Sequence, residues 1–269
     1  MNLADYHQFT QELRLKLAGD DRVIALIALG SMAQRDYEPD EWSDHDFFVI
    51  TIQGVQEDMR QDLSWLPYAD NIIFHFRETE HGIKVLYRGG HLLEFAVFNK
   101  DELQIARLNR YRVLLDKVEL APKLAELELA TQDFVTQARV EPDQRFAEFL
   151  MNVLVGIGRQ ARGEQLSGRQ FIKTYALTHL LHMLAALKPA EQAHLLDNLD
   201  PFRRFEQVYP ALGAEINQIL VMDTLTAAQN LLALAVRELR PSLTDFPEAA
   251  VAEVQQMIAK AIQEETGHL

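Results

Sequence analysis

The sequence predicts an α+β protein, in which an N-terminal mixed β-sheet domain with flanking helices precedes a C-terminal all-α helical bundle. The 269 residues are 48% hydrophobic and include only 12 Gly and 9 Pro, a composition typical of a folded globular chain. From Val23 to about Asp116, short β-type runs alternate with turn residues, whereas from about Lys117 onward apolar residues recur at helical spacing. Since a typical domain has about 100 to 200 residues, we predict two domains, residues 1–120 and residues 121–269.

The N-terminal domain is expected to begin with an amphipathic helix that ends near Gly19, because glycine readily forms the C-terminal cap of a helix. The run Val23–Leu29 is almost continuously apolar and stops at Gly30 and Ser31. Such a run is typical of a strand that is covered on both faces. The other strand candidates, which would join it in a mixed sheet, are Phe47–Ile50, Asn71–Phe76, Ile83–Tyr87 and Leu92–Phe98.

The C-terminal domain is expected to consist of helices joined by short loops. Apolar residues at helical spacing mark the segments Phe146–Arg162, Arg169–Leu187, Ala190–Leu199, Ala214–Leu239 and Pro247–Glu265. Proline and glycine residues fall between these segments or at their starts, where they interrupt or begin helices. A helical bundle is the natural packing for such a chain.

Composition and charge exclude several classes of function. Without cysteine the chain has no disulfide, zinc ribbon, iron–sulfur cluster or thiol nucleophile, which fits a reducing cytoplasm. Lys and Arg number 26 against 40 Asp and Glu, and the net charge of -14 would repel a nucleic acid. The same charge would attract a cationic small molecule or a divalent metal, although it also serves solubility. No apolar stretch approaches the roughly 18 residues of a membrane span, so we expect a cytoplasmic protein without a membrane partner.

Two aspartates stand at the start of a predicted strand. Asp44 and Asp46 are separated by one residue, so the alternation of side chains along a strand places both carboxylates on one face and His45 on the other. Aspartate is a poor strand former, and two neighbouring carboxylates repel each other. A hard divalent cation with oxygen ligands would hold them together, and magnesium is the obvious candidate. The alternative is a solvated loop end at which Asp44 caps a turn.

Two further features would complete a site around this pair. A strand that ends at Gly30 and Ser31 and runs into a short helix exposes backbone N–H groups and a hydroxyl to an anion such as a triphosphate, although a plain turn is the alternative. Glu94 interrupts the apolar run Leu92–Phe98. An ionised group there requires a metal, a basic neighbour or a displaced pKa, unless it lies exposed on an edge strand.

Gly30-Ser31, Asp44-x-Asp46 and Glu94 together resemble the pattern of the nucleotidyltransferases of the DNA polymerase β superfamily, which is Gly-Ser, a spacer, Asp-x-Asp and a third acid on a later strand. The spacer that leads into Asp44 looks most like that of the bacterial antibiotic nucleotidyltransferases, which adenylylate streptomycin-type aminoglycosides or lincosamides. Those enzymes are also similar in pairing an N-terminal mixed sheet with a C-terminal helical bundle.

The resemblance implies an enzyme that moves a nucleoside monophosphate, AMP from ATP or the monophosphate of another nucleoside triphosphate, onto a hydroxyl of a small molecule and releases pyrophosphate. Asp44 and Asp46 would bridge two magnesium ions, and Glu94 would complete the second metal site or accept the proton of the hydroxyl. Gly30 and Ser31 would hold the β- and γ-phosphates. Aminoglycoside and lincosamide antibiotics are the candidate acceptors, and a cationic acceptor would suit the acidic chain.

Charge balance predicts that cations of the helical domain complete this site. ATP brings about four negative charges to three carboxylates, so two magnesium ions still leave an excess of negative charge. Arg159 lies at the end of one predicted helix, and Arg169 and Lys173 share a face at the start of the next. We expect these residues to bind the triphosphate, with solvated surface charge as the alternative.

Two other functions remain compatible with these motifs. One is a nucleotidyltransferase that modifies a protein, although the minimal enzymes of that kind are generally shorter and lack a fused bundle. The other is a non-catalytic nucleotide-binding regulatory module, although all three acids are present. Elsewhere, His179 and His182 share a helix face without a third ligand at metal-site spacing, which favours ordinary helix histidines. Trp42 would stack on a base or a substrate ring, or anchor its loop.

Overall fold

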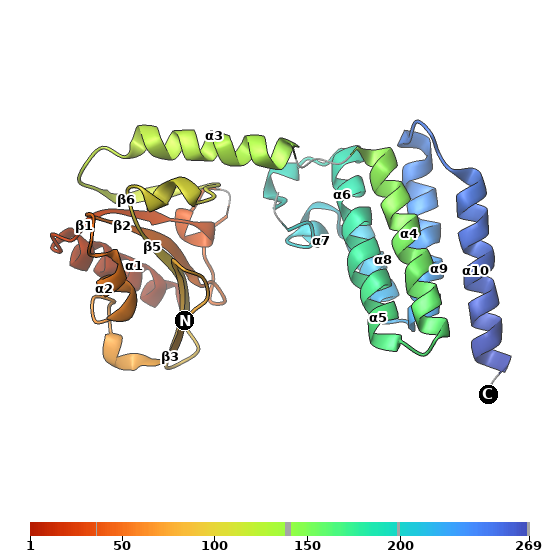
Figure 1. The fold of residues 1–269 in the computed structure, drawn as a ribbon, viewed down its shortest axis with the longest axis horizontal. Coiled ribbons are helices and arrows are strands. Elements are labelled where there is room, and N and C mark those ends of the chain that lie inside the picture. The colour runs from red at the N-terminus through yellow and green to blue at the C-terminus, as the bar shows by residue number, and fades with distance from the viewer. Residues whose placement is uncertain (36, 138–140, 198–199, 268–269) are drawn as a thin grey trace. The chain divides into compact units, whose positions relative to one another are not determined.

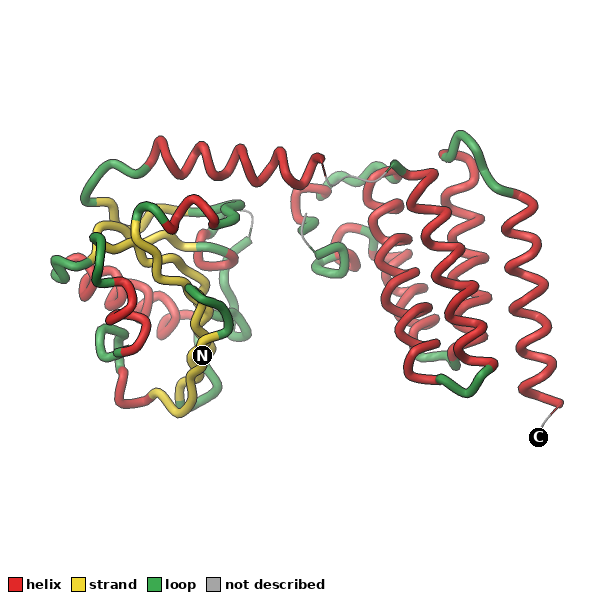
Figure 2. The backbone as a smooth tube through the Cα atoms, viewed as in Figure 1, coloured by secondary structure: helices red, strands yellow, loops and turns green. Residues whose placement is uncertain are grey.

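The computed structural model describes residues 1–269 except 36, 138–140, 198–199 and 268–269. The chain divides into two compact units, Met1–Gln137 and Ala138–Leu269. The first unit contains a mixed sheet with helices and the second is helical (Figure 1, Figure 2), which confirms the predicted α+β class. Helix α3 (Ala121–Gln137) groups with the sheet, so the first unit extends past residue 120, where the sequence predicts the boundary.

The first unit is built on a six-stranded mixed sheet. Its strands are β1 (Val23–Ala28), β2 (His45–Thr51), β3 (Ile72–Arg77), β4 (Gly82–Tyr87), β5 (Leu92–Asn99) and β6 (Arg112–Asp116), in the spatial order β3-β4-β5-β2-β1-β6. β2 and β5 are parallel, and the other neighbours are antiparallel. The sequence does not predict β6, because its apolar residues Val113–Leu115 are too few to mark a strand.

Helices cover both faces of this sheet. α1 (Leu3–Ala18) ends at Gly19 as predicted and packs residues such as Phe9 and Leu13 against one face, while α3 packs Leu124 and Leu127 against the other. β1 lies between β2 and β6, and burial of all its residues confirms a strand that is covered on both faces. The connections contain the short helices η1 (Gly30–Ala33), α2 (Gln56–Gln61), η2 (Ala69–Asn71) and η3 (Glu102–Ile105).

The second unit packs its helices around one apolar core. The longer helices are α4 (Pro142–Ala161), α6 (Leu177–Leu187), α8 (Pro210–Leu220), α9 (Thr224–Leu239) and α10 (Glu248–Gly267). α5 (Gln165–Gln170) continues through a π-helical turn, η4 (Phe171–Ala176), into α6. The short helices η5 (Ala193–Leu195), α7 (Phe205–Val208) and η6 (Arg240–Ser242) lie between the longer ones. No helix in the described part of the chain is both long and apolar enough to cross a membrane.

Two of the predicted helices differ in the structure. The segment Ala190–Leu199, which follows Pro189, contains only the three-residue η5 among its described residues, and its last two residues lie outside them. The segment Ala214–Leu239 is divided into α8 and α9. The side chain of Asp223 accepts a hydrogen bond from the N–H of Thr226, so a new helix begins where the sequence predicts a continuous one.

Candidate active site

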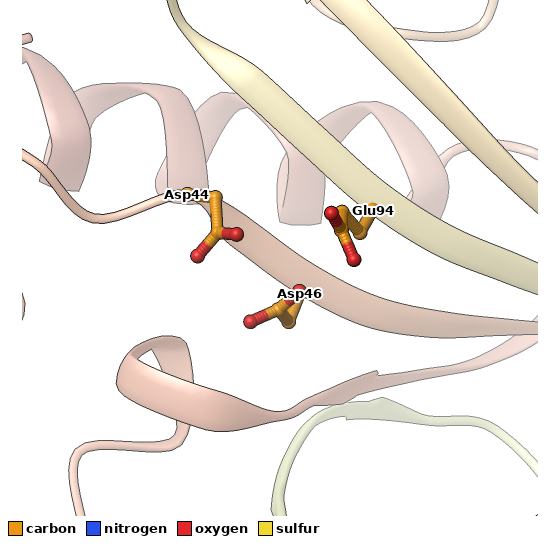
Figure 3. A group of neighbouring side chains, drawn as sticks. All are labelled: Asp44, Asp46 and Glu94. Carbon is orange, nitrogen blue, oxygen red and sulfur yellow. The ribbon is translucent and has the colours of Figure 1, made fainter. Parts of the chain in front are cut away.

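The three acids singled out by the sequence meet on one face of the sheet. Asp46 lies on β2 and Asp44 precedes that strand, so the two side chains share a face as their spacing predicts. The parallel pairing of β2 with β5 puts Glu94 directly opposite Asp46. One carboxylate oxygen of each residue lies within 4.8 Å of those of the other two. Figure 3 shows the three half-buried side chains converging on one space.

The turn after β1 lies against this acid cluster. The N–H of Leu29 donates a 2.8 Å hydrogen bond to the carbonyl of Asp46, which ties the turn to the beginning of β2. Gly30 has a φ of +49°, and a Cβ at this position would lie 2.5 Å from Oδ2 of Asp46. Only glycine lets the backbone approach the carboxylate so closely. Ser31 follows in the short helix η1, and its side chain is buried with 6% exposed.

A buried group of rings lies behind the acids. His45 points to the face opposite the two aspartates, as predicted, and stacks on Tyr6 with the ring centroids 3.8 Å apart. Its ring nitrogens lie 2.9 Å from Oγ1 of Thr10 and 2.8 Å from Nε2 of His91. Burial lowers the pKa of His45 to about 3 and the pKa of His91 to about 4. Both rings are therefore neutral near pH 7 and add no charge to the acid cluster.

Tyr6 connects α1 to both motifs of the site. Its hydroxyl donates a 3.0 Å hydrogen bond to the carbonyl of Asp44 and lies 3.4 Å from Oγ of Ser31. Burial raises the pKa of this hydroxyl, so it stays protonated and keeps its donor. The sequence does not reveal this role, because Tyr6 has the spacing of an ordinary core residue of the helix. α1 therefore fixes the backbone from which the first aspartate projects.

Lys84 is a second site residue that sequence reasoning missed. It lies on β4 directly opposite Glu94 of β5. Its Nζ is 3.0 Å from Oε1 of Glu94 and 3.0 Å from Oε1 of Glu78. The hydrogen bonds to Glu94 and then to Glu78 raise the pKa of Lys84. The one signal in the sequence is that Lys84 alternates with the apolar Ile83 and Val85, which assigns it to the other face of its strand.

The three cations predicted to bind the triphosphate all belong to the second unit, where Arg159 and Lys173 make polar contacts. Nη1 of Arg159 is 2.6 Å from Oε2 of Glu164. Nζ of Lys173 donates to the carbonyl of Leu220, the last residue of α8, at 2.8 Å, and to the carbonyl of Met222 beyond this helix. Arg169 lies one turn before Lys173, in α5. Binding of a triphosphate by these residues stays a prediction.

The sequence also draws attention to two histidines and one tryptophan, His179, His182 and Trp42. Among the described residues, the potential metal ligands that gather in a group of at least three are those of the acid cluster. Neither His179 nor His182 belongs to this group. Trp42 is 87% exposed, so it does not anchor its loop by burial, and stacking on a base stays a prediction.

The acid cluster has the donors that a hard divalent cation requires. Its three carboxylates supply oxygen ligands, which Mg²⁺ prefers, and they lie close enough together for ions to bridge them. Because Gly30 has no side chain, the backbone of the turn can lie directly beside the carboxylate of Asp46. The cluster therefore fits magnesium better than a soft metal, which would select thiolate or imidazole ligands.

No protein family model and no curated protein matches this chain. Among solved structures, the chain is similar to an aminoglycoside 6-adenyltransferase from Bacillus subtilis, with 12% identity, a TM-score of 0.28 and coverage of 96% of both chains. It is also similar to a STING-associated CdnE c-di-GMP synthase from Capnocytophaga granulosa, with 12% identity, a TM-score of 0.29 and coverage of 98% of this chain and 81% of that chain. These TM-scores are too low for either likeness to decide an activity, which must rest on the site itself.

Proposed function

We propose that this protein is a magnesium-dependent nucleotidyltransferase that transfers AMP from ATP to a hydroxyl group of a small molecule. The observation that carries the proposal is the convergence of Asp44, Asp46 and Glu94 beside the Gly30–Ser31 turn. Three carboxylates so close together repel one another unless cations neutralise them. Transfer of a nucleotidyl group brings divalent cations and an anionic substrate to such a cluster.

In this proposal the acids hold two magnesium ions. Asp44 and Asp46 would bridge the ions, and Glu94 would complete the second one or act as a base. Bound magnesium would supply positive charge for the triphosphate and lower the pKa of the attacking hydroxyl. The backbone N–H groups at Gly30 and Ser31 would hold the β- and γ-phosphates, where negative charge increases on the leaving group.

The proposed reaction is an in-line displacement at phosphorus. The hydroxyl oxygen of the acceptor forms a bond to the α-phosphorus of ATP, and the bond from that phosphorus to the oxygen that bridges to the β-phosphate breaks. Pyrophosphate leaves with the electron pair. The proton of the hydroxyl goes to Glu94 where this residue acts as the base, or to solvent where it is a metal ligand, and Lys84 holds the carboxylate by its ion pair.

Arg159, Arg169 and Lys173 are the proposed cationic partners of the triphosphate. The charge excess described above supports this part of the proposal. Since Lys173 also binds the backbone carbonyl of Leu220 at the end of α8, replacing it would disturb the bundle as well. Arg169→Ala is therefore the cleaner variant, and a rise of roughly tenfold in its KM for ATP would support a phosphate contact.

The decisive experiment measures magnesium-dependent release of pyrophosphate from ATP in the presence of streptomycin or lincomycin. Asp44→Asn and Asp46→Asn are each expected to abolish release without lowering the melting temperature, because removing one of several repelling carboxylates relieves strain in the metal-free protein. Glu41→Gln, at an exposed acid of the preceding loop, is the matched control and should keep full activity. Nucleotide binding without turnover would favour a regulatory module, and turnover retained in Asp46→Asn would contradict the proposal.

A further inference from the structure

The face of the sheet that carries the acid cluster continues past Glu94 onto β4 and β3. Residues directly opposite each other on neighbouring strands point to the same face. Glu94 is opposite Lys84, and Lys84 is opposite Phe76. In the adjacent row, Leu86 is opposite Phe74. The two phenylalanines therefore share a face with the proposed catalytic acid.

These phenylalanine side chains are exposed. Phe74 is 58% and Phe76 is 43% exposed, and their ring centroids lie 5.8 Å apart. β3 is an edge strand of the sheet, next to β4. His75, between them, points to the opposite face, because it pairs with the buried Val85. Contiguous exposed apolar patches mark interaction sites, whereas apolar side chains scattered singly over a surface are ordinary.

We infer that Phe74, Phe76 and Leu86, which we term the phenyl surface, bind a ring of the acceptor whose hydroxyl reacts at the acid cluster. This inference rests on the proposed function and names the surface that selects the acceptor. Neighbouring strands lie about 4.8 Å apart, so Phe76 and Glu94 are separated by about 10 Å across the sheet. A compound of two linked rings spans that distance, with one ring on the phenyl surface and a hydroxyl of the other at Glu94.

The negative charge around the phenyl surface indicates the charge of the acceptor. Between the phenyl surface and the two aspartates, Lys84 is held by Glu78 and Glu94, so two carboxylates accompany one ammonium group. The aspartates add two more negative charges, and the whole chain carries -14. A positive group on the acceptor is attracted to such a surface. The expected acceptor is a small hydroxylated ring compound that carries at least one amine.

The continuity of the phenyl surface with the acid cluster favours this occupant over a second copy of the chain. Both lie on one face and follow the same cross-strand rows, so a ring bound to the phenylalanines is already directed along the sheet toward Glu94. A second copy paired along the edge of β3 would instead cover both faces of this strand, including His75. The two occupants therefore predict different effects of replacing residues on the two faces.

The test compares the double variant Phe74→Ala/Phe76→Ala with His75→Ala in the full-length protein. All three side chains are exposed, so the replacements spare the core. The probes are streptomycin, lincomycin and p-nitrophenyl β-glucoside, the last of which lacks an amine. For the probe that binds most tightly, we expect the dissociation constant from titration calorimetry to rise at least tenfold in the double variant and less than twofold in His75→Ala. Phe76→Trp should retain binding, and the affinity for ATP should change less than twofold throughout.

The outcomes separate the inference from the proposed function. Equal losses in the double variant and in His75→Ala, or no probe whose binding depends on the two phenyl rings, would overturn the phenyl surface as an acceptor site. It would also be overturned if light scattering showed a dimer that the double variant converts to a monomer without a change in probe binding. Pyrophosphate release that survives Asp46→Asn would overturn the proposed function instead, whatever the phenylalanine variants do.

Discussion

Gly30 lies so close to Asp46 that a single added carbon atom, a Cβ, would collide with the carboxylate. In Gly30→Ala, the new Cβ would lie 2.5 Å from Oδ2 of Asp46, on a backbone with a φ of +49°. The left-handed backbone and the displaced carboxylate both oppose the substitution. We expect the free energy of unfolding, measured by chemical denaturation, to fall by about 2 kcal/mol or more.

Gly89→Ala is the matched control for this prediction. Gly89 also has a positive φ, of +92°, but nothing lies within 4 Å of its hypothetical Cβ. Only the backbone cost remains there, and it amounts to about 1 kcal/mol. Equal losses in the two variants would show that the carboxylate of Asp46 yields without cost, and that the approach of the turn is not a constraint.

At the proposed metal site, Lys84 would compete with a metal ion for the carboxylate of Glu94. Lys84→Met removes a positive charge from the edge of the acid cluster, and the repulsion between this charge and a doubly charged ion about 6 Å away in water is about 1.4 kcal/mol. We expect the dissociation constant for Mg²⁺, measured by titration calorimetry, to fall about tenfold. Lys84→Arg should leave it near the wild-type value, and Lys100→Met, at an exposed lysine, should not change it. Weaker Mg²⁺ binding in Lys84→Met would mean that Lys84 orients Glu94 more than it competes.

At the residue scale, the acids could be predicted because their signal is local. The spacing of Asp44 and Asp46 sets their shared face, and Glu94 is conspicuous within an apolar run. Lys84 and Tyr6 could not be predicted, because both have the ordinary pattern of their elements. What gives them a role is the partner that the fold brings to them, and side-chain periodicity contains no information about partners.

The register of β4 against β5 shows the same limit at the scale of elements. The dipeptide Gly89-Gly90 suggests a two-residue hairpin loop, which would place Lys84 opposite Phe95. The structure instead has the three-residue loop Arg88–Gly90, and Lys84 lies opposite Glu94. A slip of one residue moves every side chain to the other face of a strand. The two strands were therefore predictable, whereas the ion pair at the site was not.

The packing of α4 against α5 and η4 depends on a glycine that the sequence does not distinguish from its neighbour. A Cβ at Gly156 would lie 2.5 Å from Cγ1 of Ile172, whereas one at Gly158 would meet only the side chain of Arg162, at 3.5 Å. Gly156→Ala should therefore lower the free energy of unfolding by about 1 to 3 kcal/mol through overpacking. Gly158→Ala should raise it by up to about 1 kcal/mol through helix propensity. Thermal denaturation of both variants checks this, and a stabilising Gly156→Ala would contradict the close packing.

The burial of His45 on β2 makes stability depend on pH. Its pKa is about 3 in the folded protein, mainly because it is buried and also because His91 adjoins it. The unfolded chain, with a pKa near 6.5, binds a proton that the folded chain does not, so stability is lost as the pH falls below about 6.5. His45→Gln removes this proton. Between about pH 5.5 and 4, the unfolding free energy falls with decreasing pH in both proteins. The slope of this fall should be smaller in His45→Gln than in the wild type by about 1.4 kcal/mol per pH unit. Equal slopes in metal-free buffer would show that His45 is protonated in the folded state.

At the scale of the whole molecule, the change from strands to helices could be predicted because each periodicity is read within a short window. The assignment of α3 to the first unit could not be predicted. Its apolar residues at helical spacing indicate a helix with one buried face, but they do not say which core that face joins. Leu124 and Leu127 pack with Ile50 and Phe98 of the sheet, and this contact assigns the helix to the first unit.

Each of the two units has its own apolar core. The clusters on the two faces of the sheet draw their buried residues from the first unit, and the third cluster draws its buried residues from the second. We therefore expect calorimetry to resolve two unfolding transitions, one for each unit. Gly30→Ala should lower only the first unit's transition and Gly156→Ala only the second's, by about 4 °C per kcal/mol. Because the acid cluster lies in the first unit, Mg²⁺ at ten times its dissociation constant should raise only the transition that Gly30→Ala lowers, by about 1.4 kcal/mol of stability. A single transition that both variants shift equally would mean that the two units unfold together.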